Sequence, residues 1–323
     1  MRAVPLPRRR ALTLIALSVA VYLAASAAIA VVMAEDTLHT GHRPLHMRQH
    51  FASVVASDFK ADLQDVSITA ADGTPLRAWY VIPERDNGNA VVLMHGVADT
   101  REGVSGYGRM FLNRGYRVLL ADSRAHGESG GDIATYGVRE SDDIARWVKF
   151  LHDQPQTSCV YGFGGSMGAA LMLQATAATR DLCAVAVEAP FSTFREVAYD
   201  RISEQTGLGL WFARTAGRPA LEFALAYAHL KYGVDLTLAD PQRALRHSRV
   251  PSLIIAGTED TIIQPRHATA LAEAAAGETD LWIVKGAGHG GAVSMHPEQF
   301  EHRVTGWFAR HPKTQAAPVI VGQ

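Results

Sequence analysis

An α/β fold with a mostly parallel, eight-stranded sheet and helices on both faces is the fold class that the sequence predicts. The main observation is that short runs of Val, Ile, Leu and Ala alternate with longer segments of helical period between residues 90 and 285. Continuous apolar strands separated by helices are typical of parallel sheets that are covered on both faces. The second observation is an Asp-Gly turn at 72–73 between two short strand-like segments, which predicts a hairpin at the start of the sheet.

Composition excludes several classes of protein. The chain has 323 residues with 31 basic and 32 acidic side chains, long enough to bury a sizeable core in one large or two ordinary domains. The near-zero net charge argues against a nucleic-acid-binding protein, which usually carries a basic excess. Two cysteines are too few for a disulfide-dense scaffold or a cysteine-rich metal site.

Residues 11–34 form an uncharged run of 24 residues. As a helix this run would be roughly 36 Å long, enough to cross a hydrocarbon core of about 30 Å, so we expect a transmembrane anchor. The alternative is a cleaved signal peptide, because Ala-Ser-Ala at 25–27 resembles a cleavage site, although apolar signal regions are shorter, at about 7–15 residues. Arginines within residues 1–10 precede the run, and Glu35 and Asp36 follow it. This pattern favours a cytoplasmic N-terminus and an extracytoplasmic domain, periplasmic in a bacterium.

The remaining elements follow in order. Residues 35–63 are expected to form a polar connector with one short helix near 47–59. The expected strands are 66–70, 76–82, 90–94, 116–121, 158–163, 183–189, 251–256 and 281–285. Helical period is clearest at 138–152, 167–179 and 266–276.

Residues 192–249 break the alternation, since they contain no clear strand but many apolar side chains in a helix-prone segment. We expect a helical lid insertion over the carboxyl edge of the sheet, where the sites of α/β proteins lie. The folded domain is expected to span residues 64–311, with a flexible tail at 312–323.

The strand at 158–163 leads into Gly-Gly-Ser-Met-Gly at 164–168, which matches G-x-S-x-G in a strand–turn–helix context. A sharp turn that lifts one side chain off the end of a strand forces close contacts at the flanking positions, which glycine tolerates. Ser166 is therefore the candidate nucleophile. A serine hydroxyl needs a base and an orienting acid, and the chain supplies Asp260 and then His289, each after a later strand.

A serine nucleophile also needs two main-chain N–H groups that stabilise the oxyanion. The N–H of Met167, directly after the nucleophile, is one candidate. The other is the N–H of Val97, in the His-Gly loop that follows the strand at 90–94. His95 and His126 lie beside glycines near this loop, and we expect both to hold loop structure.

The combined motifs resemble the α/β-hydrolase superfamily over about residues 64–311. They are HG (95–96), DSRAHGESGG (122–131), GGSMG (164–168), GTEDTIIQP (257–265) and GAGH (286–289). The chain is most similar to the membrane-anchored α/β-hydrolase-domain proteins and to the serine-aminopeptidase and monoacylglycerol-lipase-like group, although Ala125 stands where that group usually has glycine. The resemblance implies Ser166 as nucleophile, Asp260 as acid and His289 as base.

Two further assignments stay open. Glu188 ends the strand after the nucleophile helix and is an alternative to Asp260 as the acid. Cys159 and Cys183 open neighbouring strands and could pair in an oxidising compartment, but adjacent positions within a sheet strain disulfide geometry, so we expect two buried thiols. No Asp, Glu or His cluster has metal-ligand spacing, so no metal or cofactor is expected.

These features predict a membrane-anchored serine hydrolase that cleaves a carboxylic ester through an acyl-enzyme. The apolar insertion favours an acyl or alkyl ester as the small-molecule substrate. A serine peptidase or aminopeptidase, which would take a peptide, and an acyltransferase of the same fold are the alternatives within this chemistry. A non-catalytic relative that binds a ligand or partner is the alternative from another class.

Overall fold

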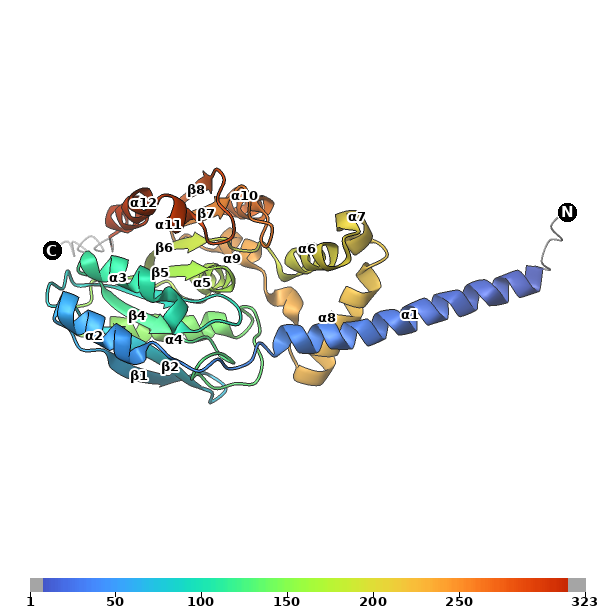
Figure 1. Cartoon of the computed structure of the whole chain (residues 1–323), viewed down its shortest axis with the longest axis horizontal. Coiled ribbons are helices and arrows are strands. Elements are labelled where there is room, and N and C mark those ends of the chain that lie inside the picture. The colour runs from blue at the N-terminus through green and yellow to red at the C-terminus, as the bar shows by residue number, and fades with distance from the viewer. Residues whose placement is uncertain (1–7, 313–323) are drawn as a thin grey trace, which may run out of the picture.

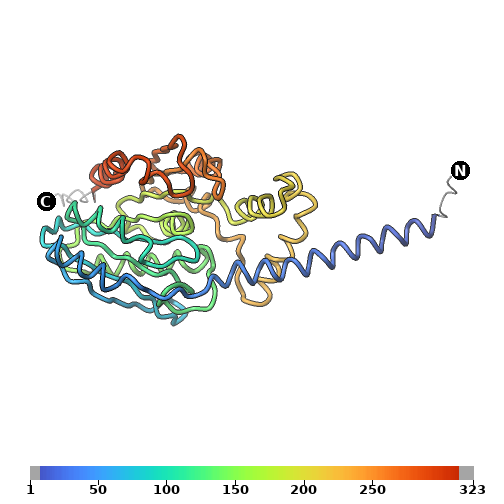
Figure 2. Tube along the Cα trace, in the orientation of Figure 1, coloured from blue at the N-terminus to red at the C-terminus, as the bar shows by residue number. Residues whose placement is uncertain are grey.

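The computed structural model describes residues 8–312, so most of the expected basic N-terminus and almost all of the expected flexible tail lie outside the described residues. Within this range, a sheet domain carries one long helix that projects away from it (Figure 1). Figure 2 shows that the described chain begins at the far end of this helix and ends on the opposite side of the sheet domain.

The sheet has eight strands in the order β1-β2-β4-β3-β5-β6-β7-β8. The strands are β1 (Gln64–Thr69), β2 (Pro75–Val81), β3 (Asn89–Met94), β4 (Arg117–Ala121), β5 (Cys159–Gly165), β6 (Leu182–Glu188), β7 (Ser252–Gly257) and β8 (Thr279–Val284). β2 pairs antiparallel with both β1 and β4, whereas all other neighbours are parallel. The expected mostly parallel sheet is confirmed, and the carboxyl ends of its parallel strands lie along one edge.

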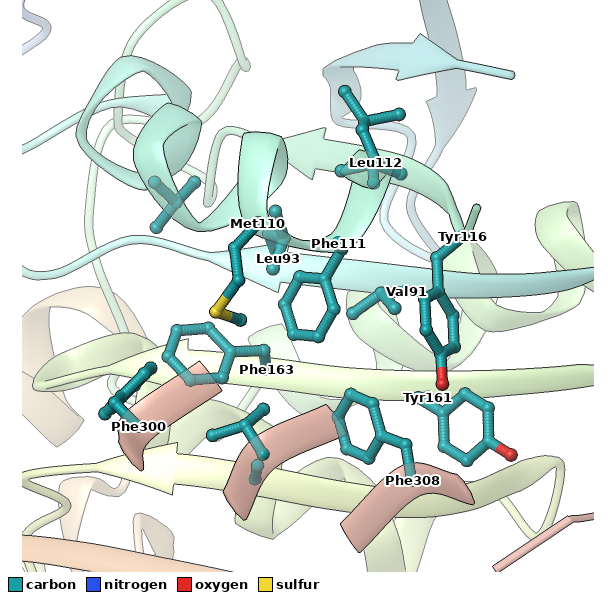
Figure 3. Packing of buried hydrophobic residues seen from close by; sticks show 14 of the residues in the cluster. Val91, Leu93, Met110, Phe111, Leu112, Tyr116, Tyr161, Phe163, Phe300 and Phe308 are labelled. Atoms are coloured by element: carbon teal, nitrogen blue, oxygen red, sulfur yellow. The ribbon is translucent and has the colours of Figure 1, made fainter. Parts of the chain in front are cut away.

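Helices cover both faces of the sheet, as expected. One face carries α2 (Arg48–Phe59), α3 (Ser105–Asn113), α11 (Ala292–Met295) and α12 (Pro297–Arg310), with the short helix η1 (Arg101–Val104) before α3. The other face carries α4 (Glu140–His152), α5 (Met167–Ala178), α9 (Pro241–His247) and α10 (Pro265–Ala274). In the first of these layers Phe308 stacks on Phe111 and on Tyr161, with ring centroids 5.6 and 4.5 Å apart (Figure 3).

The insertion between β6 and β7 is helical, as expected, and extends beside the sheet (Figure 1). We call its first three helices the lid: α6 (Phe194–Thr206), α7 (Gly209–Arg214) and α8 (Arg218–Tyr232), which the short helix η2 (Leu236–Leu238) follows. The lid is shorter than the expected insertion of residues 192–249. The reason is that α9 buries Leu245 in the core cluster of the sheet domain and so belongs to the layer beside α5.

α1 (Arg8–Leu38) is a continuous helix of 31 residues, and among the described residues it is the one helix long and apolar enough to cross a membrane. Such a helix can serve as an anchor or as a signal sequence. It extends beyond the expected span of 11–34 into the expected connector, because no glycine or proline follows until Gly41.

Cys159 and Cys183 form a disulfide, so the expectation of two buried thiols is wrong. The reason is a register shift, since Val160 pairs with Leu182 whereas Gly162 pairs with Val185. Because β6 has one extra residue here, Cys183 lies on the same face of the sheet as Cys159. The two Cα atoms are 5.9 Å apart, a usual separation for a disulfide.

Candidate active site

Ser166 lies on the sharp turn between β5 and α5, with φ +55° and ψ −119°. This conformation costs energy in any residue with a side chain and is found mostly at functional sites. A Cβ atom on Gly164 would lie 2.3 Å from the main-chain oxygen of Gly168, and one on Gly168 would lie 2.3 Å from the main-chain oxygen of Met94. The turn therefore requires both glycines, whereas Gly165 has open space around it.

The turn brings Ser166 to the histidine and the aspartate that the sequence singles out. His289 Nε2 lies 2.9 Å from Ser166 Oγ, and His289 Nδ1 lies 2.8 Å from Asp260 Oδ2. Asp260 follows β7 and His289 follows β8, so the carboxyl edge of the sheet brings to Ser166 two residues that lie 94 and 123 positions further along the chain. We call this hydrogen-bonded set the triad.

The aspartate defines the proton positions in the triad. Asp260 is 3% exposed, and its Oδ1 accepts hydrogen bonds from the main-chain N–H groups of Ile262 and Ile263, both at 2.9 Å. Its Oδ2 is therefore left to accept the Nδ1–H of His289. With Nδ1 protonated, the neutral imidazole presents an unprotonated Nε2 to the hydroxyl of Ser166.

The two expected oxyanion donors lie near Ser166. Met167 begins α5 directly after Ser166, and a Cβ on Gly96, which precedes Val97, would lie 3.9 Å from Ser166 Oγ. Within the described part of the chain, neither the Val97 N–H nor the Met167 N–H makes a hydrogen bond. Both donors are thus available to a substrate oxygen, and their role stays a prediction.

His126 supports the loop that carries Val97. Its Nδ1–H donates to the main-chain oxygen of Arg124 (2.8 Å), and its Nε2 accepts the main-chain N–H of Ala98 (3.2 Å). Both hydrogen bonds require the neutral imidazole, since a protonated ring has no acceptor. Burial, with a smaller effect of nearby His95, lowers the pKa of His126 to about 4.

His95 supports the same region. Its Nδ1–H donates to the main-chain oxygen of Gly96 (2.7 Å), and its Nε2 accepts the main-chain N–H of Ser123 (3.0 Å). Burial lowers the pKa of His95 as well. Both histidines therefore hold loop structure in their neutral form, as the sequence predicts.

Acid should destabilise the fold through these histidines. Because the folded-state pKa of His126 is lower than the unfolded value of about 6.5, its contribution is fully present above that pH and is lost as the pH falls to about 4. The loss should be about 3 kcal/mol, from roughly 1.4 kcal/mol per pKa unit. Urea unfolding between pH 7 and pH 4 measures it. His126→Gln should show a smaller pH dependence, and an unchanged one would contradict this account.

A buried ion pair holds the loop that contains His126. The Asp122 carboxylate accepts hydrogen bonds from the main-chain N–H of Arg101 (2.7 Å), from Arg101 Nε (2.9 Å) and from the main-chain N–H of Glu128 (2.8 Å). Buried charges stabilise a fold only when their other polar groups are also bonded, which is the case for Asp122. The motif at 122–131 therefore has a structural function next to the site.

Glu188, the alternative acid, bonds elsewhere. Its carboxylate accepts the main-chain N–H of Ala292 (2.9 Å) and the hydroxyl of Tyr107 (3.1 Å), and its main-chain oxygen accepts the N–H of Ser166 (2.8 Å). Burial raises the pKa of Glu188. In this geometry Glu188 supports the turn and the segment after His289, and Asp260 is the carboxylate that bonds the imidazole.

A second serine–histidine–aspartate set was not apparent from sequence motifs. Ser192 Oγ lies 2.9 Å from His267 Nδ1, and His267 Nε2 lies 2.6 Å from Asp200 Oδ2. All three residues are at most 4% exposed, and Ser192 has no left-handed backbone conformation. Since Asp200 belongs to α6 and His267 to α10, this set connects the lid to the sheet domain.

Comparison with known families identifies the fold. A family model described as the alpha/beta hydrolase family matches residues 91–303, a range that contains the whole triad. The chain belongs to the α/β-hydrolase family. The uncharacterized protein YqkD of Bacillus subtilis (strain 168) is 27% identical over 241 residues, which are 74% of this chain and 76% of that protein.

Solved structures show the same α/β-hydrolase fold. The esterase Pf2001 of Pyrococcus furiosus superposes with a TM-score of 0.64 at 23% identity, over 79% of this chain and 94% of that chain. An acetyl xylan esterase from Paenibacillus sp. R4 gives a TM-score of 0.59 at 18% identity, over 80% and 92%. At these identities the likeness is one of fold.

Proposed function

We propose that the protein is a membrane-anchored serine hydrolase that cleaves a carboxylic ester through an acyl-enzyme. The observation that carries the proposal is the hydrogen-bonded triad, with its serine on a strained turn that two obligatory glycines permit. A base within hydrogen-bond reach of a serine, with a carboxylate that orients the base, is the arrangement that activates a hydroxyl for attack on a carbonyl.

In the proposed reaction Ser166 Oγ attacks the ester carbonyl while His289 Nε2 takes its proton. Asp260 holds the imidazole and stabilises its charged form. The N–H groups of Val97 and Met167 stabilise the oxyanion of the tetrahedral intermediate. His289 then protonates the leaving alcohol, and a water that His289 deprotonates hydrolyses the acyl-enzyme and restores Ser166.

Two features support the proposed location. The long, mostly exposed helix α1, with its uncharged run at residues 11–34, is suited to anchor the chain in a membrane. The Cys159–Cys183 disulfide fits an oxidising compartment, because disulfides are rare in reducing cytosol. We therefore propose that the sheet domain is extracytoplasmic, which agrees with the arginines that precede the uncharged run.

A substrate panel tests the proposed reaction. The full chain in detergent should hydrolyse nitrophenyl esters of acyl chains with kcat/KM at least about 100-fold above that for aminoacyl nitroanilides, a difference in the range that site contacts supply. Turnover of the nitroanilides alone would identify the protein as a peptidase instead of an esterase. Turnover of neither class by the folded protein would contradict the proposal.

A further inference from the structure

The lid packs along the C-terminal half of α1. Four buried residues of this helix, at intervals of four, form one stripe: Ser26, Ala30, Ala34 and Leu38. Ala30 and Ala34 pack against Ala224 of α8, where small side chains let the two helices approach closely. The N-terminal half of α1 projects past the lid (Figure 1).

Polar contacts fix this arrangement at the end nearest the sheet domain. The Glu35 carboxylate accepts hydrogen bonds from the hydroxyls of Tyr227 (2.5 Å) and Tyr232 (2.8 Å) and from Lys231 Nζ (2.8 Å). The main-chain oxygen of Leu38 accepts the N–H of Ala134 at 2.9 Å. α1 is therefore attached both to the lid and to the sheet domain.

The far end of the lid reaches the apolar part of α1. The hydroxyl of Tyr22 donates to the main-chain oxygen of Ala216, the second residue after the end of α7. Tyr22 precedes Glu35 by 13 residues, so along the helix α7 lies roughly 20 Å closer to the N-terminus than the polar contacts do.

The length of the uncharged run determines how much of the lid-covered part of α1 must lie within the membrane. Even with Tyr22 and its lid contact included, residues 11–25, which precede the buried stripe, give a helix of roughly 22 Å, whereas a hydrocarbon core is about 30 Å thick. The missing part, roughly 8 Å, must come from the portion of α1 along which the lid packs. A span anchored by α1 thus immerses the far end of the lid.

The far end of the lid has the composition of an interfacial segment. We call residues 208–212 the lid tip. In residues 205–217, Arg214 is the single charged side chain. Leu208 is 60% exposed and Trp211 is 79% exposed, high values for large apolar side chains. Tryptophan is enriched at the boundary between acyl chains and headgroups, where its ring is buried and its N–H stays solvated.

We propose that the lid tip inserts into the adjacent leaflet of the bilayer beside α1, so that the lid is a membrane-interface element. Interfacial segments bury their apolar face about 5–10 Å into this boundary, which agrees with the missing length of roughly 8 Å. Lipid acyl chains thus cover the exposed surface around Leu208 and Trp211. The inference rests on the proposed anchoring by α1 and does not require catalysis.

Quenching of tryptophan by brominated lipids tests the insertion. The other four tryptophans are at most 9% exposed, so lipid contact involves Trp211. In phosphatidylcholine vesicles that carry the full chain, lipids brominated in the upper acyl chain should quench Trp211 more strongly than lipids brominated near the chain end. Trp211→Phe should remove most of this quenching.

A matched probe on the same lid controls for depth. Leu230 is 84% exposed on α8, next to Lys231 and therefore at the level of the polar contacts. In the double variant Trp211→Phe and Leu230→Trp, the new tryptophan should show no lipid quenching.

The outcomes separate the two proposals. If the protein floats with the vesicles but Trp211 is not quenched, the insertion is overturned. Cross-linking of two chains through their lid tips would then show that a second copy covers this surface. Protein that does not float overturns the anchoring itself. Ester hydrolysis in detergent is measured independently of both.

Discussion

Replacing Ser166 with alanine is expected to lower kcat/KM for an ester by a factor on the order of 10⁴–10⁶, the usual effect of removing a triad nucleophile. The loss follows from the geometry, because no other hydroxyl lies against His289 Nε2 among the described residues. The fold should persist, since Ser166 is half-buried and its side chain makes no other hydrogen bond in that part of the chain. Kinetics with a nitrophenyl ester, together with circular dichroism, measures both quantities.

Ser192 provides the matched control. It also bonds a histidine that bonds an aspartate, but it is buried and lies on no strained turn. Ser192→Ala should therefore retain ester hydrolysis within a few-fold of the original. Loss of activity in a folded Ser192→Ala protein, with activity retained in Ser166→Ala, would reverse the assignment of the nucleophile.

Replacing Asp260 with asparagine is expected to lower kcat by about 10⁴, with a smaller change in KM. Because Oδ1 accepts the N–H groups of Ile262 and Ile263, the new amide nitrogen must occupy the position of Oδ2. An amide there donates to Nδ1 of His289 and so moves the ring proton to Nε2. The imidazole then presents N–H to Ser166 and can no longer act as a base.

Steady-state kinetics of Asp260→Asn and Glu188→Gln distinguishes the two candidate acids. Glu188→Gln removes a charge, but its amide oxygen still accepts the N–H of Ala292 and its amide N–H can donate to the hydroxyl of Tyr107, so its effect should be far smaller. A loss of less than about tenfold in Asp260→Asn, beside a larger loss in Glu188→Gln, would make Glu188 the acid.

The sequence predicted the sheet and the triad because local rules determine both. Apolar runs between helices specify a parallel sheet, and its carboxyl edge brings the ends of β5, β7 and β8 together. Gly164 and Gly168 are fixed by contacts within the turn itself, so the pattern identifies Ser166 without knowledge of distant parts of the chain.

The features that the sequence did not predict depend on long-range packing. The disulfide requires the extra residue in β6, which turns Cys183 to the face of Cys159 and which no local pattern marks. Likewise, the uncharged run of α1 contains a stripe of small residues whose partner, Ala224, is almost 200 residues away. The sequence also did not predict where the lid ends. That boundary is set by α9, whose apolar face packs beside α5 in the core of the sheet domain.

Labelling of the full chain in detergent with a fluorophosphonate, with the labelled peptide identified by mass spectrometry, tests the central claim most directly. The oxygen of an activated serine displaces fluoride from this reagent and becomes phosphonylated, without the need for a matching substrate. A label on Ser166 alone is expected, absent from Ser166→Ala and unchanged in Ser192→Ala. A folded protein that takes no label, or a label that persists in Ser166→Ala, would contradict that claim.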